Sequence, residues 1–269
     1  MSQAAPVSPG LRRFLRRRVR NQEMPLVDHL RELRKRLVIS AVAFLALSTA
    51  AFFLYQPILA LIQGPLCSLD PKLLGSQGCD LVFVRVLGGF MFRLKVTALA
   101  GIFVSAPIWL YQIWAFVTPA LRTSEKKYAL PFVTSTILLF ATGAVFAYLT
   151  LPTGLRLLVS IGGDGLVPLL GAEEYLSFVG LLLLGFGAMF ELPLLLFFLG
   201  LAGVITVQQL RQHRKVALVS IVALAAIVTP SQDPYTLLVL SVPLYLFYEV
   251  TILLLMLVDR RKRTKAATA

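Results

Sequence analysis

The chain has 269 residues, of which 58% are hydrophobic and only 14% are charged. This composition excludes an ordinary soluble domain, whose apolar share is about 45–50%. Long uncharged runs indicate an all-α integral membrane protein instead. The formal charge is +13, but the cations gather near the N-terminus and after Val258 rather than along one extended face. That distribution favours contacts with membrane lipids and excludes nucleic acid as the expected partner.

The two ends of the chain are basic. Residues 1–24 show little helical periodicity, and we expect a disordered cytoplasmic tail there. Residues 25–258 form the predicted transmembrane domain, and residues 259–269 form a second basic cytoplasmic tail. The first apolar run begins about 36 residues into the chain, too far back for a cleavable signal peptide, so we expect none.

A short amphipathic helix is predicted just before the first apolar run. Four leucines recur there at helical spacing, and we expect this helix to lie in the membrane interface. These are Leu26, Leu30, Leu33 and Leu37.

Six apolar runs predict six membrane-spanning helices. They cover approximately residues 37–55, 94–117, 128–151, 175–201, 216–228 and 235–258. Pro107 lies within the second run, while Glu191 and Pro193 interrupt the fourth. The fifth run has thirteen residues, or roughly 20 Å of helix, which is short of the ~30 Å hydrocarbon core.

The longest polar connection, residues 56–89, is rich in proline and glycine and predicts an outer cap with short helices. Cys67 and Cys79 lie in it, twelve positions apart. No metal-ligand spacing accompanies them, so we expect no metal site. A disulfide and two free thiols are both open alternatives at this point. In the last outer connection, Asp233 of the PSQDP sequence is most simply a turn residue.

Charge placement predicts the orientation in the membrane. An even number of spans puts both termini on one side. The N-terminal region, the 122–127 turn, the 211–215 loop and the C-terminal tail hold ten, three, three and five of the 26 Lys and Arg residues. By the positive-inside rule, that side is cytoplasmic.

Two carboxylates are predicted on the cytoplasmic side, each with two interpretations. Glu32 lies in HLRELRKRL, where an ion pair with Arg36 would contribute a few tenths of a kcal/mol. Glu125 lies in RTSEKK, where an acid in the first turn of a helix is favoured by the helix dipole. Alternatively, both could accept bidentate hydrogen bonds from the arginines of a partner.

Glu191 lies deep in an apolar run, where an ionised and unpaired carboxylate costs several kcal/mol. It is therefore a functional candidate, although a local polar network near Pro193 is an alternative. Glu249 gives a similar but weaker signal. The two histidines, His29 and His213, both lie at cytoplasmic edges. This excludes a Ser–His intramembrane protease, and without a nucleotide-binding motif we expect neither an enzyme nor a cofactor.

Several sequence motifs, in order, resemble the TatC family, the polytopic subunit of the twin-arginine protein translocase. They are HLRELRKRL before the first span, SAPIWLYQIWAFVTPALRTSEKKY across the second and third, YLSFVGLLLLGFGAMFELP in the fourth, and the TP…DP turn before the sixth. The resemblance extends from Met24 to about Val258.

The resemblance implies a receptor and scaffold that helps to export folded proteins across the cytoplasmic membrane with the proton-motive force. Implied partners are the single-span proteins TatA and TatB, twin-arginine signal peptides, and further copies of the chain within a larger complex. The implied signal-peptide site comprises Glu32, Arg34, Phe116, Pro119 and Glu125. The resemblance also assigns roles to Glu191 in the fourth span and to Pro65 and Asp233 in the outer loops.

The alternative function is proton-coupled transport of a small molecule, with Glu191 and Glu249 as a proton relay. A water-filled cavity between two pseudo-symmetric halves would favour this function. The sequence shows no convincing internal repeat, which counts against inverted-repeat transporters.

Overall fold

The computed structural model describes residues 26–74, 78–117, 129–161, 169–228 and 234–267. Within these residues every regular element is a helix, apart from one isolated bridge between Val82 and Gly171. The predicted N-terminal tail, Pro119, Glu125 and Asp233 lie outside the described residues.

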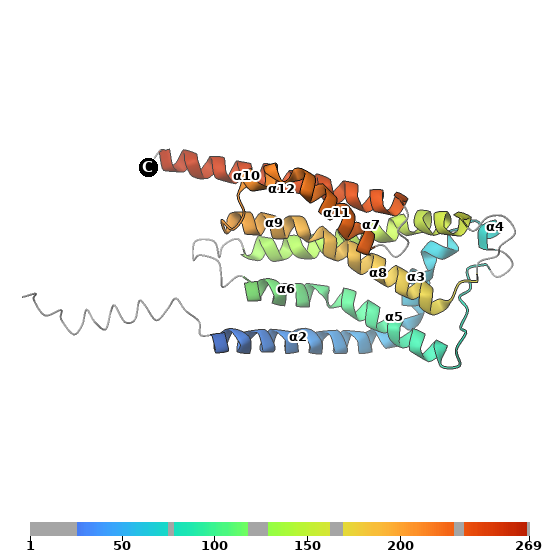
Figure 1. Ribbon diagram of the computed structural model, residues 1–269. Coiled ribbons are helices and arrows are strands. Elements are labelled where there is room, and N and C mark those ends of the chain that lie inside the picture. Colours follow the sequence, from blue (N-terminus) through green and yellow to red (C-terminus); the bar gives the residue numbers. More distant parts are fainter. Residues whose placement is uncertain (1–25, 75–77, 118–128, 162–168, 229–233, 268–269) are drawn as a thin grey trace, which may run out of the picture.

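Most of the helices run roughly side by side along one direction (Figure 1). They are α2 (Leu26–Phe53), α5 (Gly88–Val104), α6 (Ala106–Val117), α7 (Ala129–Ile161), α8 (Ala172–Phe190), α9 (Leu192–Leu201), α11 (Arg214–Val228) and α12 (Pro234–Ala267). The other helices of the described residues are α3 (Tyr55–Cys67), α4 (Pro71–Leu74) and α10 (Val207–Gln212).

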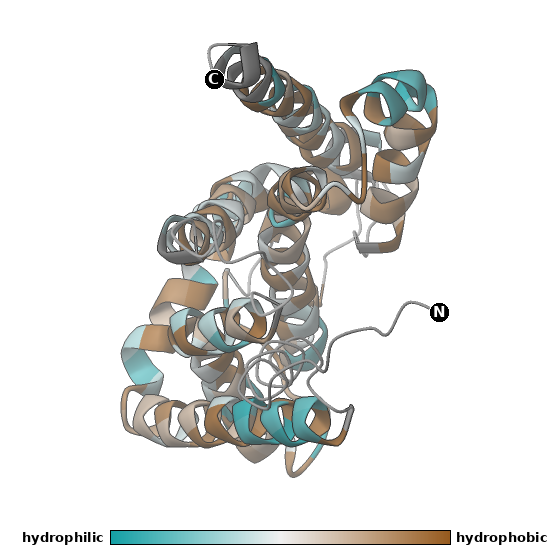
Figure 2. Ribbon diagram, turned by 90° about the vertical axis from the view of Figure 1, so that its left-hand side faces the viewer, coloured by the Kyte–Doolittle hydropathy of each residue, from teal (hydrophilic) through white to brown (hydrophobic). Residues whose placement is uncertain are grey.

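The two ends of the molecule are formed by different helices. The start of α2, the end of α6, α10 and the end of α12 gather at one end, on the left in Figure 1. We call this the basic end, and Figure 2 views the molecule from it, with hydrophilic residues concentrated at the start of α2 and in α10. Helices α3 and α4 lie at the opposite end.

The chain is a multi-pass membrane protein. Among the described residues, four helical stretches are long and apolar enough to cross a membrane: Val27–Phe53, Pro131–Ser160, Ala172–Leu201 and Thr236–Arg260. Helices α5 and α6 together would make a fifth, bent by 52°. The remaining predicted span corresponds to α11, whose 15 residues extend over about 22 Å.

The predicted amphipathic helix is not a separate element. Helix α2 is continuous over 28 residues from Leu26 to Phe53, so the HLRELRKRL segment extends the first span instead of lying across it. The expectation of an interfacial helix is corrected accordingly. The physical reason is that this stretch contains no glycine or proline to end the helix.

Proline explains the bend in the second span. Pro107 has no N–H to donate to the carbonyl group four residues earlier, so α5 ends at Val104 and α6 begins at Ala106. The Trp109 indole N–H donates to the Ile102 carbonyl oxygen across the bend, at 3.1 Å. This contact supports the 52° angle between the two helices.

Two helices continue beyond their predicted ends. Helix α7 runs past Pro152 to Ile161, because Leu151 and Leu155 pack into the core there. Helix α12 continues through the basic C-terminal segment to Ala267, where arginine, lysine and alanine are good helix formers.

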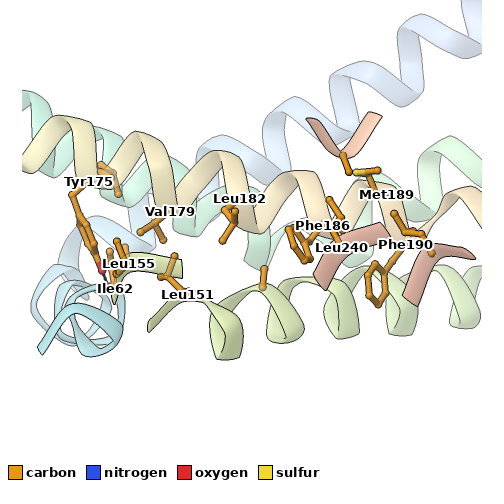
Figure 3. Packing of buried hydrophobic residues seen from close by; sticks show 14 of the residues in the cluster. Ile62, Leu151, Leu155, Tyr175, Val179, Leu182, Phe186, Met189, Phe190 and Leu240 are labelled. Atoms are coloured by element: carbon orange, nitrogen blue, oxygen red, sulfur yellow. Dashed lines mark hydrogen bonds between the residues drawn. The ribbon is translucent and has the colours of Figure 1, made fainter. Parts of the chain in front are cut away.

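Helix α8 is the centre of the hydrophobic core. Eleven of its 19 residues are buried, and Figure 3 shows Val179, Leu182 and Phe186 along it, with Leu151 and Leu155 on the helix beside it. Burial on this scale follows from a helix that is apolar almost all round.

Two glycines allow α7 and α8 to approach closely. A Cβ atom on Gly143 would lie 2.7 Å from the Phe186 carbonyl oxygen. One on Gly187 would lie 2.7 Å from the Phe140 ring. Small residues at such crossings bring the helix backbones together, and this close approach holds α8 in place.

The predicted outer cap consists of α3, α4 and the segment after them. Tyr148 and Tyr175 donate hydrogen bonds from their hydroxyl groups to the Leu61 and Ile62 carbonyls of α3, at 2.8 and 2.7 Å. Pro65 lies buried inside α3, so its place is in a helix of the cap rather than in an irregular loop.

A disulfide closes the cap. It joins Cys67, at the end of α3, to Cys79, with their Cα atoms 5.0 Å apart. Shortly afterwards, the Val82 N–H donates to the Leu170 carbonyl and the Ala172 N–H donates to the Val82 carbonyl, both at 3.0 Å. These bonds attach the disulfide-bonded segment to the beginning of α8.

Candidate functional site

The first candidate site lies at the basic end, where the start of α2 meets the end of α6. The rings of His29 and Phe116 stack with centroids 4.3 Å apart and an angle of 18° between their planes. Further along both helices, Arg36 Nη1 donates to Gln112 Oε1 at 3.3 Å. The HLRELRKRL motif and the end of the IWAFV segment therefore form one surface, which we call the α2–α6 surface.

Glu32 lies on α2 between these two contacts. Its side chain is 27% exposed, and its Oε1 atom accepts hydrogen bonds from Nε and Nη2 of Arg36. The ion pair of the simpler interpretation is thus present. Both contacts go to the same oxygen, and no described residue donates to Glu32 Oε2. The carboxylate can therefore accept a further donor.

Spacing explains which side chains share the α2–α6 surface. His29, Glu32 and Arg36 follow one another at i, i+3 and i+7, and Gln112 and Phe116 at i and i+4, so each set lies on one helix face. His29 and Gln112 were not predicted as site residues, although this spacing was visible in the sequence. The contacts of His29 with Phe116 and of Gln112 with Arg36, across the two helices, could not be predicted from that spacing.

Arg34 does not lie on the α2–α6 surface. It comes two residues after Glu32, about 200° around the helix. Its side chain is exposed and forms no ion pair with a described residue.

Trp114 orients the end of α6. It is buried, with ring centroids 5.5 Å from Phe132 of α7 and 5.1 Å from Phe198 of α9. Because Phe116 follows two residues later, it lies on the other side of α6 and meets α2. The aromatic residues of this segment therefore pack α6 against α7 and α9 on one side and against α2 on the other.

Glu191 forms a second candidate site, at the break between α8 and α9. Its Oε1 atom is buried and has no hydrogen-bond partner among the described residues. Its polar neighbours on α7 are the Thr136 side chain and the Phe140 backbone, and the Thr136 hydroxyl is itself buried without a hydrogen-bond partner among the described residues. Thr251 donates to the Pro193 carbonyl at 3.2 Å and to the Phe247 carbonyl at 2.8 Å, so its hydroxyl proton is not available to Glu191.

Glu249 has a different environment from Glu191. Arg214 Nη2 donates to its Oε2 atom at 2.7 Å, and the Tyr245 hydroxyl donates to Oε1 at 3.1 Å. Both oxygens therefore have partners within the chain, and the carboxylate joins α11 to α12. In the described parts of the chain, no hydrogen bond links Glu249 directly to Glu191.

The described residues contain no candidate metal site. Within the ranges that the structure describes, no group of three His, Cys, Asp or Glu residues is placed to hold a metal ion.

Comparison with known proteins gives a consistent result. The family model described as "Sec-independent protein translocase protein (TatC)" matches residues 28–243. The Sec-independent protein translocase protein TatC of Frankia casuarinae is 44% identical over 260 residues, covering 94% of this chain and 71% of the relative. The TatC protein of Aquifex aeolicus is 37% identical over 243 residues, covering 89% of this chain and 98% of the relative.

Solved structures resemble the fold as well. A crystal structure described as "Twin Arginine Translocase Receptor- TatC in DDM" superposes with a TM-score of 0.71 at 37% identity, covering 84% of this chain and 98% of that one. A second crystal structure of the twin-arginine translocase receptor TatC gives a TM-score of 0.70 at 36% identity, covering 85% of this chain and 98% of that one.

Proposed function

Because this chain belongs to the TatC family of Sec-independent protein translocase subunits, we propose that it binds twin-arginine signal peptides at the α2–α6 surface. Its function within the twin-arginine translocase is that of a receptor and scaffold rather than an enzyme. The observation that carries the proposal is the Glu32 carboxylate, which lies on the α2–α6 surface and whose Oε2 atom receives no hydrogen bond from a described residue.

The contacts of Arg36 suit an exchange of partners. An incoming guanidinium group can bind Glu32 Oε2, or it can displace Arg36 from Oε1. In the second case Arg36 keeps its hydrogen bond to Gln112 Oε1. Displacing Arg36 exchanges one arginine–carboxylate contact for another of the same kind, so the free energy changes little. A donor at Oε2 adds a hydrogen bond to a charged group, which contributes about 1.5–3 kcal/mol net.

Glu125 is the proposed second carboxylate for the arginine pair. It follows the end of α6 in the sequence, and Phe116, next to the last described residue of α6, contacts α2 through His29. The described part of α6 therefore ends beside the start of α2. Two carboxylates at one membrane depth match two adjacent guanidinium groups of a signal peptide.

The proposed topology has six spans in the cytoplasmic membrane, with both termini in the cytoplasm. Support comes from the start of α2 and the end of α12, which lie at the same end of the molecule (Figure 1). Helix α11 would be a fifth, short span, and the bilayer would thin around it or partner helices would cover it. The basic end would then face the cytoplasm, where precursor proteins are made.

Glu191 is the proposed contact for the transmembrane helix of a TatA or TatB partner. Glu191 is partly exposed, and one of its carboxylate oxygens has no described hydrogen-bond partner. This supports the role, because a polar group in a membrane helix requires a partner. In this proposal several copies of the chain assemble with these partners, and the proton-motive force drives export.

Photo-crosslinking tests the receptor function directly. A twin-arginine peptide carrying a photoreactive residue beside its arginines is irradiated with the purified protein, and the adducts are located by mass spectrometry. We expect adducts on α2 and α6 at the basic end, and few with a twin-lysine peptide, because lysine lacks the bidentate geometry. Adducts confined to α3 and α4, or equal labelling by both peptides, would contradict the proposal.

A further inference from the structure

A second basic site lies apart from the α2–α6 surface. An open cleft of about 840 Å³ separates α10 and the start of α11 from the last turns of α12. Its polar and charged lining includes Gln208, Arg211, Arg214, Asp259 and Arg260, with Met256 as an apolar contact. The proposed recognition of signal peptides does not use this cleft.

Two buried or partly buried contacts hold the walls of the cleft in place. The Tyr248 hydroxyl of α12 donates to the Leu210 carbonyl of α10 at 2.7 Å. Arg214 at the start of α11 pairs with Glu249 of α12, also at 2.7 Å. A capping box between Thr206 and Gln209 stabilises the start of α10. The cleft is therefore formed before any ligand arrives.

Arginines from opposite walls remain available to a ligand. Glu249, Met256 and Arg260 follow at i, i+7 and i+11, so Arg260 lies on the α12 face that meets α10 and α11. Arg211 is the residue after Leu210 and lies on the other wall. Both arginines are exposed, and neither forms an ion pair with a described residue.

The depth of the cleft matches a lipid headgroup. The stretch of α12 that is long and apolar enough to cross a membrane ends at Arg260, so we expect the arginines at the boundary between hydrocarbon and water. On the hydrocarbon side, the neighbouring surface is apolar and exposed. It includes Val216 and Val219 of α11 and Leu257 of α12, which are 59%, 68% and 55% exposed.

We propose that this cleft binds the phosphate headgroup of an anionic phospholipid, with the acyl chains along α11 and α12. Arginine binds phosphate oxygens with two parallel hydrogen bonds, and basic pockets at the ends of membrane helices suit anionic headgroups. Arg214 is already paired with Glu249, but Arg211 and Arg260 still outnumber Asp259, the one acid lining the cleft. This balance favours an anionic headgroup over a zwitterionic one.

Native mass spectrometry of the full chain tests the proposal. The protein is titrated with phosphatidylglycerol or phosphatidylcholine and then released from detergent in the instrument. We expect phosphatidylglycerol to bind more tightly. Each basic residue near anionic lipid contributes about fivefold in affinity, so the double variant Arg211→Gln/Arg260→Gln should bind phosphatidylglycerol about 25-fold more weakly. Phosphatidylcholine shares the phosphate but carries a compensating cation, so its binding should fall by a smaller factor.

A matched control removes the same charge elsewhere. Arg85 and Arg156 are exposed and belong to the opposite end of the molecule, so Arg85→Gln/Arg156→Gln should leave phosphatidylglycerol binding unchanged. An equal loss in both double variants would show a general charge effect and overturn the proposal. Displacement of the lipid by inorganic phosphate at matched ionic strength would assign the cleft to free phosphate instead.

Discussion

His29 and Phe116 stack face to face with 4.3 Å between their ring centroids, although they belong to different helices. This stack sets the register between the start of α2 and the end of α6. With the register set, Arg36 reaches Gln112 while it also holds Glu32. The geometry of the α2–α6 surface therefore depends on an aromatic contact as well as on charge.

Loss of the Glu32 carboxylate is expected to weaken binding of a twin-arginine peptide. Glu32→Ala should lower the affinity roughly tenfold or more, because one hydrogen bond to a charged group contributes about 1.5–3 kcal/mol. The measurement is peptide affinity at fixed salt on protein reconstituted in a membrane.

Asp28→Ala is the matched control for Glu32→Ala. Asp28 lies on the same helix, its side chain is 54% exposed, and it pairs weakly with Arg31 at 3.7 Å. The control should bind the peptide as the unchanged protein does. If both variants bind equally well, Glu32 acts only through its ion pair with Arg36.

Substitutions of Glu125 should give a graded series. Glu125→Asp keeps the carboxylate one methylene short, Glu125→Ala removes it, and Glu125→Lys adds repulsion to an arginine pair. We expect peptide affinity to fall in that order, with Glu125→Ala losing roughly tenfold. A role limited to the helix dipole would instead cost under about 1 kcal/mol of stability and leave binding unchanged. Wild-type affinity and lysine discrimination in Glu125→Ala would rule out a recognition role.

Glu191 should act in assembly rather than in peptide recognition. It lies at the α8–α9 break, away from the α2–α6 surface, with a buried oxygen that lacks a described partner. Glu191→Ala should therefore leave peptide affinity intact and reduce co-purification of partner subunits or export. Glu173→Ala serves as the control, because Glu173 already pairs with Lys95 at 3.2 Å. A Glu191→Ala protein that assembles fully but loses peptide binding would contradict this assignment.

The Cys67–Cys79 disulfide should form when the cap faces an oxidising compartment. Mass spectrometry of protein alkylated without reductant should find neither cysteine alkylated, because both sulfur atoms are in the disulfide. Closing a loop of this size stabilises a fold by roughly 3 kcal/mol in the chain-entropy account. Cys67→Ser/Cys79→Ser should therefore unfold more readily than the unchanged protein. Complete alkylation of both thiols before reduction would show that the bond does not form.

Glycine at the α7–α8 crossing should be required for stability. Gly143→Ala would place a methyl group 2.7 Å from the Phe186 carbonyl oxygen, and overpacking of this kind costs about 1–3 kcal/mol. In contrast, Gly89 has no atom within 4 Å of an added Cβ, so Gly89→Ala should be neutral or slightly stabilising. Thermal unfolding of both variants in the same detergent compares them. Equal unfolding temperatures would show that the crossing tolerates a methyl group.

Local sequence was enough to predict much of this protein. Apolar runs predicted the membrane helices, because burial in lipid is governed by the composition of each segment. The position of Glu191 beside Pro193 predicted the break between α8 and α9, because a proline cannot donate the next helical hydrogen bond. The Glu32–Arg36 pair also followed from spacing alone, since residues four apart are neighbours on a helix.

Contacts between distant segments required the folded structure. The partner of Glu249 is Arg214, 35 positions away, and neither hydropathy nor helical spacing relates the two. The stack of His29 on Phe116 was not predicted. Helix α7 extends past Pro152, and helix α2 is continuous, both of which differ from the predictions. Periodicity says which residues share a face of one helix, whereas packing between helices selects which faces meet. That selection depends on side-chain shapes from the whole chain, such as the close approach at Gly143 and Gly187.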